Sequence, residues 1–374
     1  MAKRNAAEED WDTLRGFFPA GWEELAEKHG VLKGLRQDKS PEKFLRVLLI
    51  HLGCGFSLRE TVTRARKAEL SDFSDVALLK RLRKSKDWLR ALCGALFAER
   101  KAQVVLSEAT ALRLIDATLV KEPGKTGSQW RIHYSLQWPE LKCDYFKLSP
   151  TEGKGTGESL VHYPLRSGEH VLADRGYCRA ADFHYAAARG AKTLIRLNPG
   201  TIRMETVTGQ RFPLLARLQS LTKTGETREW AVWVPFENDP PLPLRLCVIR
   251  KSKTAIQRSL KKLRRKASIN QRTLEPETLR YAEFIMVLTS FPAKQFSTMA
   301  VLEYYRFRWQ IELLFKRLKQ LAQMGHLPKY DDESSQAWLY GKLLVALLTE
   351  KLIAYGRDFS PWGYPLQTEA KSVA

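Results

Sequence analysis

The sequence predicts an α/β protein in which a helical N-terminal region precedes a core that mixes strands and helices. Residues 1–105 are short segments with helical spacing of apolar residues and repeated helix-start signals. Residues 111–148 alternate apolar and polar side chains, and residues 170–197 follow a strand–turn–helix–strand order. Helical spacing returns from residue 302 to Gln323, where the chain contains no Gly or Pro.

Residues 1–105 are expected to form a helical DNA-binding domain. Ser40 precedes Pro41, as an N-cap precedes a proline at the first helical position, and Ser57 and Glu60 have capping-box spacing. The later helices carry many cations: Arg64, Arg66, Lys67, Lys80, Arg81, Arg83 and Lys84. Short basic helices suit a helix-turn-helix-like domain that reads DNA. A plain helical bundle with a basic surface is the alternative.

The clearest strand pattern falls within residues 111–148. One face carries apolar side chains: Trp130, Ile132, Tyr134, Leu136 and Trp138. His133 lies on the opposite, polar face. We expect His133 to be solvated rather than part of a metal or DNA site.

Two aspartates are predicted at the ends of strands. Asp116 lies near the end of an apolar, β-prone run, and Asp174 directly follows the short run 171–173. Arg175 and Gly176 form the turn after Asp174, before an Ala-rich helix. Acidic side chains at the ends of adjacent strands can converge at one edge of a sheet. The alternatives are that Asp174 is only a turn residue and Asp116 only a strand-end residue.

The helical segment up to Gln323 is expected to present one charged stripe. At about 100° per residue, a stripe about 60° wide contains Tyr305, Arg308, Glu312 and Lys319. The apolar residues fall on the opposite side: Phe307, Ile311, Leu314, Leu318 and Leu321. A solvated charged face is the alternative to a functional one. Three converging carboxylates would require a cation between them, and oxygen ligands suit Mg²⁺ or Mn²⁺.

These residues together resemble a known family. Asp116-Ala117-Thr118, Asp174-Arg175-Gly176-Tyr177 and the spacing Tyr305-x2-Arg308-x3-Glu312-x6-Lys319 are similar to the DDE transposases of bacterial insertion sequences. The last spacing is the signature of the insertion-sequence-four family, and the resemblance covers about residues 110–325. Many members have a second Asp where this chain has Ala117, so no role is carried to that residue.

The resemblance implies a ribonuclease-H-like core with Asp116, Asp174 and Glu312 as catalytic metal ligands. They would hold two Mg²⁺ or Mn²⁺ ions, while Arg308 and Lys319 grip phosphates and Tyr305 donates a hydrogen bond to one. The expected divisions are core residues 106–200, a β-rich basic insertion at 201–292, a core part with the Glu312 helix at 293–330, and a helical tail at 331–374. The resemblance also implies a DNA hairpin intermediate and a homodimer on paired transposon ends.

The expected insertion contains the densest basic run in the chain. Residues 250–266 carry nine Lys or Arg and no acid. Phosphate is the natural partner of such a run, through side chains such as Lys261, Lys262, Arg264 and Arg265. A solvated basic helix is the alternative. Trp230 and Trp233 are candidates for holding a flipped base, although packing inside the insertion is the simpler role.

The composition also favours DNA. The chain has 62 Lys+Arg against 41 Asp+Glu, a net charge of +21 and a pI of about 9.8, which favours a polyanion. No apolar run approaches 18 residues and no signal peptide is evident, which excludes a membrane span. Five scattered cysteines indicate reduced thiols, so we expect a cytoplasmic, nucleoid-associated bacterial protein.

The predicted function is therefore a DNA transposase that acts on inverted-repeat ends and target DNA. Two alternatives remain at the level of sequence. One is a DNA-binding repressor or host factor that keeps the fold without catalysis. The other is a ribonuclease-H-like nuclease acting on RNA–DNA hybrids.

Overall fold

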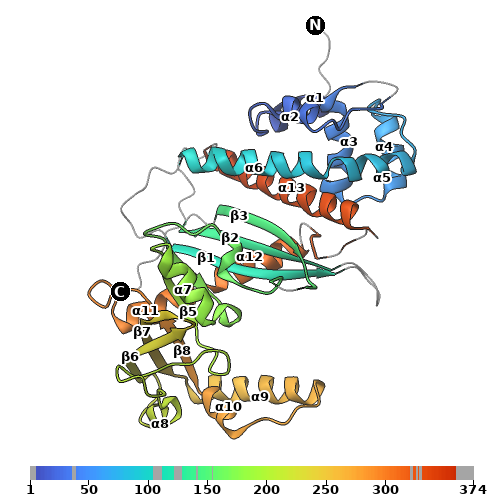
Figure 1. The fold of residues 1–374 in the computed structure, drawn as a ribbon. Coiled ribbons are helices and arrows are strands. Elements are labelled where there is room, and N and C mark those ends of the chain that lie inside the picture. The colour runs from blue at the N-terminus through green and yellow to red at the C-terminus, as the bar shows by residue number, and fades with distance from the viewer. Residues whose placement is uncertain are drawn as a thin grey trace. The chain divides into compact units, whose positions relative to one another are not determined.

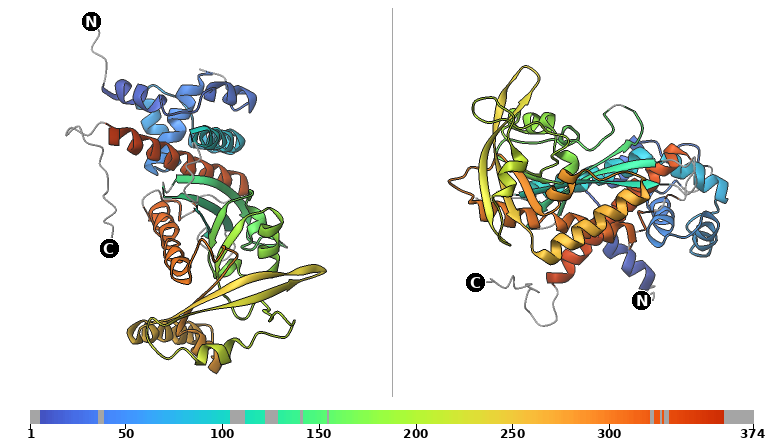
Figure 2. Two further views of the ribbon diagram at one scale, coloured as in Figure 1. Left: turned by 90° about the vertical axis from the view of Figure 1, so that its left-hand side faces the viewer. Right: turned by 90° about the horizontal axis from the view of Figure 1, so that it is seen from below.

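The fold of the chain comes from a computed structural model that describes residues 6–35, 39–103, 112–121, 129–139, 142–153, 155–320, 323–325, 327 and 331–358. The chain separates into two compact units. One unit contains residues 1–107, 119–131 and 314–374, and the other contains 108–118 and 132–313. Figures 1 and 2 show the elements of each unit. Residues 359–374 of the predicted tail lie outside the described residues.

The first unit is mainly helical. Its helices are α1 (Ala6–Arg15), α2 (Trp22–Lys28), α3 (Pro41–Cys54), α4 (Leu58–Lys67), α5 (Asp75–Lys84), α6 (Lys86–Gln103) and α13 (Asp332–Asp358). The long helix α13 lies along α6 and also contacts α3 and α5, as Figure 1 shows. The N-cap predictions are confirmed, because the Ser40 and Ser57 hydroxyls accept hydrogen bonds from the backbone N–H groups of Lys43 and Glu60. The structure shows only the serine half of the predicted capping box, since the Glu60 carboxylate accepts a hydrogen bond from Arg64. The N-terminal helices therefore share their packing with a helix from the other end of the chain.

One eight-stranded mixed sheet runs through the core in the order β3-β2-β1-β4-β5-β8-β7-β6. Its strands are β1 (Leu112–Lys121), β2 (Gln129–Trp138), β3 (Lys142–Pro150), β4 (His170–Ala173), β5 (Lys192–Arg196), β6 (Thr227–Phe236), β7 (Asp239–Arg250) and β8 (Phe284–Thr289). β1, β4 and β5 are parallel neighbours, and β8, β7 and β6 continue the sheet in antiparallel fashion. The α/β prediction is confirmed.

The strand–turn–helix–strand prediction for residues 170–197 is also confirmed. β4 leads through the short helix η2 (Arg175–Tyr177) into α7 (Ala180–Ala188) and then β5. Phe183 and Ala186 of α7 join the apolar cluster formed by Val171, Ala173 and Ile195. Another short helix, η1 (Leu160–His162), lies between β3 and β4.

Residues 201–292, expected to be an insertion, extend the sheet of the core. β6 and β7 form the long hairpin that Figure 2 shows, and β8 pairs β7 with β5. The region also contains α8 (Leu214–Gln219), α9 (Lys253–Ile269) and α10 (Pro276–Tyr281). Val232 and Leu246 of the hairpin join the same buried cluster as Ile195 of β5. The expected β-rich character is present, and the hairpin shares its core with the strands that carry the aspartates.

Two local predictions are wrong. The segment expected to be one helix up to Gln323 is two helices, α11 (Thr298–Arg306) and α12 (Trp309–Gln320), with a turn at Phe307–Arg308. The turn is tight, because the N–H groups of Phe307 and Arg308 bond to carbonyls three residues back, and the Phe307 ring stacks on Trp138 with centroids 4.4 Å apart. Leu321, expected on the apolar side, lies outside the described residues.

His133 is buried rather than solvated. Its Nε2 atom lies 2.8 Å from the Ser149 hydroxyl, and its ring lies 4.2 Å from that of His162. The loop that contains η1 covers the face of β2 that looked polar in the sequence. Among the described residues, no helix is long and apolar enough to cross a membrane.

Candidate active site

Asp116 of β1 and Asp174, which directly follows β4, lie side by side because β1 and β4 are neighbouring parallel strands. The register pairs Ile115 of β1 with Ala173 of β4, so the residues that follow are Asp116 and Asp174. The register therefore brings these two aspartates to neighbouring positions, and their role as metal ligands stays a prediction. Asp116 is not at the end of its own strand, which runs to Lys121. It lies instead level with the end of the shorter strand β4, so the pairing of β1 with β4 ends beside it.

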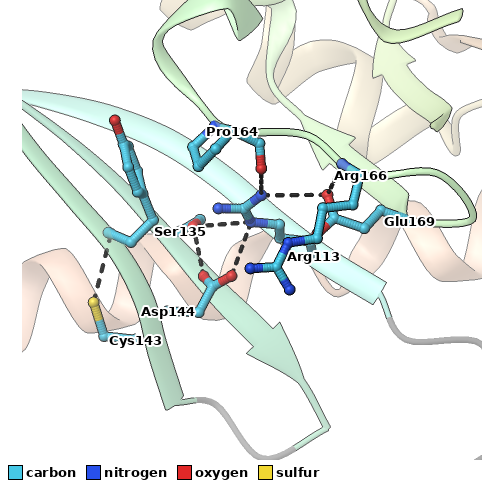
Figure 3. A network of polar contacts seen from close by, with 8 residues as sticks. Arg113, Ser135, Cys143, Asp144, Pro164, Arg166 and Glu169 are labelled. Atoms are coloured by element: carbon cyan, nitrogen blue, oxygen red, sulfur yellow. Dashed lines mark hydrogen bonds and ion pairs between the residues drawn. The ribbon is translucent and has the colours of Figure 1, made fainter. Parts of the chain in front are cut away.

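A buried charge network holds β1 in place just before Asp116, as Figure 3 shows. The Arg113 guanidinium is only 6% exposed and contacts Asp144 at 3.0 Å and Glu169 at 3.3 Å. It also donates to the Ser135 hydroxyl and to the Pro164 carbonyl. These partners come from β2, β3 and the segment that leads into β4. The guanidinium N–H groups of Arg113 thus donate to acceptors on neighbouring segments and hold β1 against them.

The surroundings of the Asp116 carboxylate disfavour its charged form. Burial raises its pKa to about 7, and the negative charges of Asp174 and Glu158 add to that rise. The hydrogen bond from the Ala117 N–H, at 2.8 Å, and the charge of Arg308 oppose the rise. Asp116 is therefore a carboxylate whose negative charge is poorly compensated within the chain.

Arg308 links the other two acids. Its guanidinium lies 3.9 Å from Asp174 Oδ1 and donates a 2.5 Å hydrogen bond to Glu312 Oε1. The arginine side chain is only 13% exposed, whereas Glu312 is 50% exposed. The sequence placed Arg308 on one charged stripe with Glu312, and the structure also brings its guanidinium to Asp174, directly after β4. Asp174, Arg308 and Glu312 thus form one connected group.

Tyr305 and Lys319 occupy different surroundings. Tyr305 is buried, with the Arg308 guanidinium 5.8 Å from its ring centre. Burial raises the pKa of Tyr305 to about 12, and the charge of Arg308 opposes that rise. The Lys319 ammonium donates a 3.2 Å hydrogen bond to the Leu119 carbonyl, so part of its bonding capacity is used within the chain.

A second set of cations near Asp174 was missed in the sequence. Burial lowers the pKa of Arg175, and the charge of Arg196 lowers it further. Burial also lowers the pKa of Lys251 to about 8, with help from Arg196 and Arg175. These three cations, here called the cation cluster, come from η2, from β5 and from the position directly after β7: Arg175, Arg196 and Lys251. Their proximity depends on strand pairing between distant segments, which the sequence does not reveal.

The predicted DNA-binding side chains of the basic run lie on α9. This helix has no buried residue, and Lys261, Lys262, Arg264 and Arg265 are all exposed. Figure 1 shows α9 projecting from the strands of its unit. Of the two tryptophans, Trp230 packs near Phe212 with ring centroids 6.1 Å apart, and Trp233 is partly exposed.

The donor set fits a divalent cation in part. Two carboxylates, those of Asp116 and Asp174, adjoin each other and repel, and a bound Mg²⁺ or Mn²⁺ would relieve that repulsion. Among the described residues, no three His, Cys, Asp or Glu side chains are gathered closely enough to hold an ion. The third predicted ligand, Glu312, is bonded to Arg308. The aspartate pair therefore suits a divalent cation. To become a ligand, Glu312 would have to give up its hydrogen bond to Arg308.

The mixed sheet, with acids on two adjacent parallel strands and on a later helix, is compatible with a ribonuclease-H-like DDE core. Comparison with protein families agrees: the model described as "Transposase DDE domain" matches residues 149–348, more than half of the chain. The chain belongs to the DDE transposase family.

Two of the named relatives are similar over almost the whole chain, and a third over about two thirds of it. The putative transposase InsL of insertion sequence element IS186A from Escherichia coli K12 is 30% identical over 368 residues, which are 96% of this chain and 97% of the relative. The transposase of IS421 from Escherichia coli is 30% identical over 369 residues, with the same coverage. The transposase of IS231F from Bacillus thuringiensis subsp. israelensis is 25% identical over 65% of this chain and 57% of its own length.

Proposed function

We propose that this protein is a metal-dependent transposase of the insertion-sequence-four type. It would bind inverted-repeat ends, cleave the DNA there and join the ends to target DNA. The observation that carries the proposal is the register of Asp116 beside Asp174, with Arg308 connecting Asp174 to Glu312. Acidic side chains whose negative charge is poorly compensated, next to an arginine that contacts two of them, suit a metal site that cleaves phosphodiester bonds.

Asp116, Asp174 and Glu312 would hold Mg²⁺ or Mn²⁺, with two ions in the site. Bound ions of this kind activate a water or a 3′-hydroxyl and stabilise the leaving oxygen. Asp116 would give up its proton when the cation arrives, because its pKa lies near 7 without one. Arg308, released from Glu312, keeps its position over Tyr305 and is free to contact a phosphate.

The surrounding cations would position the DNA strand. The cation cluster of Arg175, Arg196 and Lys251 adjoins Asp174, and its mutual repulsion makes a phosphate a favourable partner. Tyr305 and Lys319 would support the same strand. The exposed cations of α9, and those of the basic helices α4 and α5, would each contact backbone phosphates.

The finer steps follow the family resemblance. Cleavage through a DNA hairpin requires a base turned out of the stack and held on an aromatic surface. Trp233 is the better candidate because Trp230 already packs against Phe212. Two copies of the chain would be needed to hold two ends, so we propose a homodimer, working in the bacterial cytoplasm on nucleoid DNA.

A cleavage assay tests this function. The substrate is a duplex that carries the inverted repeats flanking the coding sequence, incubated with Mg²⁺. Asp116→Asn, Asp174→Asn and Glu312→Gln should each abolish strand cleavage and leave end binding, because most affinity comes from Lys and Arg. Glu303→Gln, a matched change of an exposed acid on α11, should cleave normally. Near wild-type cleavage by any of the three variants would remove that residue from the ligand set.

A DNA-binding protein without catalysis is the second candidate. The bond between Glu312 and Arg308 favours it, because that bond removes the third acid from the metal site. The same assay separates the two functions: the repressor would bind ends without cutting them at any Mg²⁺ or Mn²⁺ concentration. An RNA–DNA hybrid as substrate separates both from a ribonuclease-H-like nuclease.

A further inference from the structure

Two buried tyrosines form hydrogen bonds next to the aspartate pair. Tyr163 is 1% exposed and directly follows η1, and Tyr177 is fully buried at the end of η2. The Tyr163 hydroxyl donates a 2.8 Å hydrogen bond to the main-chain carbonyl of Asp116, and it lies 3.1 Å from the Tyr177 hydroxyl. Because Tyr163 gives its one hydroxyl proton to Asp116, Tyr177 must be the donor in the second contact.

The main chain of Tyr177 extends this connection to the other aspartate. The Tyr177 N–H donates a 3.1 Å hydrogen bond to the Asp174 carbonyl. A continuous path therefore runs from the Asp116 carbonyl, through the two hydroxyls and the Tyr177 backbone, to the Asp174 carbonyl. Tyr163 and Tyr177 are here called the tyrosine path.

The tyrosine path begins where the ladder between β1 and β4 ends. The last paired residues of this ladder are Ile115 and Ala173, and each directly precedes one of the two aspartates. Beyond that pair, hydrogen bonds between the strands no longer set the spacing of the two main chains. The tyrosine path supplies the next connection between them.

The main chain of Tyr163 is itself anchored on both sides. Its N–H donates a 2.9 Å hydrogen bond to the Leu160 carbonyl, and its carbonyl accepts a 3.0 Å hydrogen bond from the Tyr185 hydroxyl of α7. A buried hydroxyl costs free energy unless it is hydrogen-bonded, so phenylalanine would be the simpler residue for packing at both positions of the path. Packing alone therefore does not account for the two hydroxyls.

We propose that Tyr163 and Tyr177 are positioning residues that hold the main chains of Asp116 and Asp174 at the spacing that strand cleavage needs. This inference rests on the proposed function, in which the two aspartates act together on one phosphodiester. A displacement of about 1 Å in a reacting group can cost about 10²-fold in rate, so the spacing matters. The alternative is that the two hydroxyls only satisfy each other in the core.

Single-turnover cleavage of pre-bound end DNA tests the proposal, with end affinity measured separately. Tyr163→Phe keeps the ring and removes the path, and it should slow cleavage about 10–100-fold, the usual range for a residue that orients a metal ligand. End affinity should stay at the wild-type value, because most of it comes from Lys and Arg. The matched control is Tyr145→Phe, which removes a hydroxyl bonded at 2.6 Å to the His162 carbonyl and should cleave normally.

Unfolding in urea gives a second readout that needs neither DNA nor metal. Tyr163→Phe leaves the Tyr177 hydroxyl buried without the acceptor that it has in the wild type. Adding Tyr177→Phe should then cost no further stability, so the loss in the double variant should be smaller than the sum of the two single losses. Losses that simply add would show two independent contacts and would overturn the tyrosine path.

Tyr177→Phe also covers the case in which Tyr163→Phe fails to fold, because it breaks only the second hydrogen bond and should slow cleavage in the same direction. A wild-type cleavage rate in either folded variant, or an equal loss in Tyr145→Phe, would overturn the positioning role. Asp116→Asn separates this failure from that of the proposed function. If Asp116→Asn is inactive while Tyr163→Phe cleaves normally, only the role of the tyrosines is wrong. If Asp116→Asn also cleaves normally, the proposed function is wrong.

Discussion

Two charged residues of β1, Arg113 and Asp116, have opposite surroundings although the same strand carries both. Arg113 is enclosed by Asp144, Glu169 and two neutral acceptors, so its positive charge is answered within the chain. Asp116 adjoins Asp174, and within the described part of the chain its carboxylate accepts a hydrogen bond from the Ala117 N–H and feels the charge of Arg308. The first group stabilises the fold.

The pair of Asp116 and Asp174 leaves negative charge that a cation from solution can neutralise. A balanced network resists change, because each partner would be left unpaired by the loss of another. A group with excess negative charge destabilises the metal-free protein and favours the metal-bound one. The contrast separates residues that build the sheet from residues that we propose act on DNA, and each prediction below tests one side of it.

The largest expected effect is on the balanced side. Arg113→Met should lower the free energy of unfolding by about 3–5 kcal/mol, because it leaves Asp144 and Glu169 without their buried cation. Urea denaturation measures the change. A loss under about 1 kcal/mol would show that the network is not a main support of β1.

Substitution of Arg308 tests the link that this residue forms between Asp174 and Glu312. Arg308→Ala should reduce the rate of strand cleavage by the equivalent of about 1–3 kcal/mol, the range for a charge-assisted hydrogen bond to a phosphate. Single-turnover kinetics on pre-bound DNA provide the measurement. Arg308→Lys keeps the charge but not the fork, so it should recover only part of the rate. Full activity in Arg308→Ala would place the arginine outside the reaction.

The titration of Asp116 gives a pH dependence. Because its pKa is raised to about 7, the carboxyl is protonated in the apo protein below that pH, and a cation must displace the proton. Apparent Mn²⁺ affinity should therefore fall about tenfold for each pH unit below pH 7 and level off above it. Titrations at pH 5.5, 6.5 and 8 test the slope. Affinity that does not change across this range would mean that Asp116 is ionised throughout.

The smallest effect on the fold is expected at α9. Replacing Lys261, Lys262, Arg264 and Arg265 by Gln should leave stability unchanged, because the helix has no buried residue. It should reduce the salt slope of DNA binding by about 2–4 units, since each phosphate that a cation neutralises adds about 0.9 to that slope. Affinity should fall equally on specific and unrelated duplex. An unchanged slope between about 50 and 200 mM salt would show that α9 is only a solvated surface.

The sequence predicted features that depend on neighbouring residues. The β-strands that carry Asp116 and Asp174, the caps at Ser40 and Ser57, and the order from β4 to β5 were all visible in local patterns. The break at Phe307–Arg308 was not, because helical periodicity does not include the stacking of Phe307 on a distant strand.

Interactions between distant segments account for the remaining differences. His133 is buried beside His162 in the loop that follows β3, and the Glu158 carboxylate occupies the space that a side chain on Gly176 would take. The cation cluster needs β5, β7 and η2 together. The sequence contains each of these residues, but their proximity is a property of the fold.

The most direct test compares the unfolding of Asp116→Asn and Asp144→Asn in metal-free protein at pH 8. A carboxyl whose folded pKa is raised above the unfolded value of about 4 destabilises the fold increasingly from about pH 4 to pH 7, and fully above it. Asp116→Asn should therefore raise the free energy of unfolding by roughly 2–4 kcal/mol, since one pKa unit is about 1.4 kcal/mol. The amide oxygen can still accept from Ala117.

Asp144→Asn removes a charge that Arg113 needs and should lower the free energy of unfolding by about 1–3 kcal/mol. The account predicts these opposite signs, together with loss of cleavage in Asp116→Asn. If Asp116→Asn destabilised the protein as Asp144→Asn does, or if it still cleaved DNA, Asp116 would be a structural residue and the central claim would be wrong.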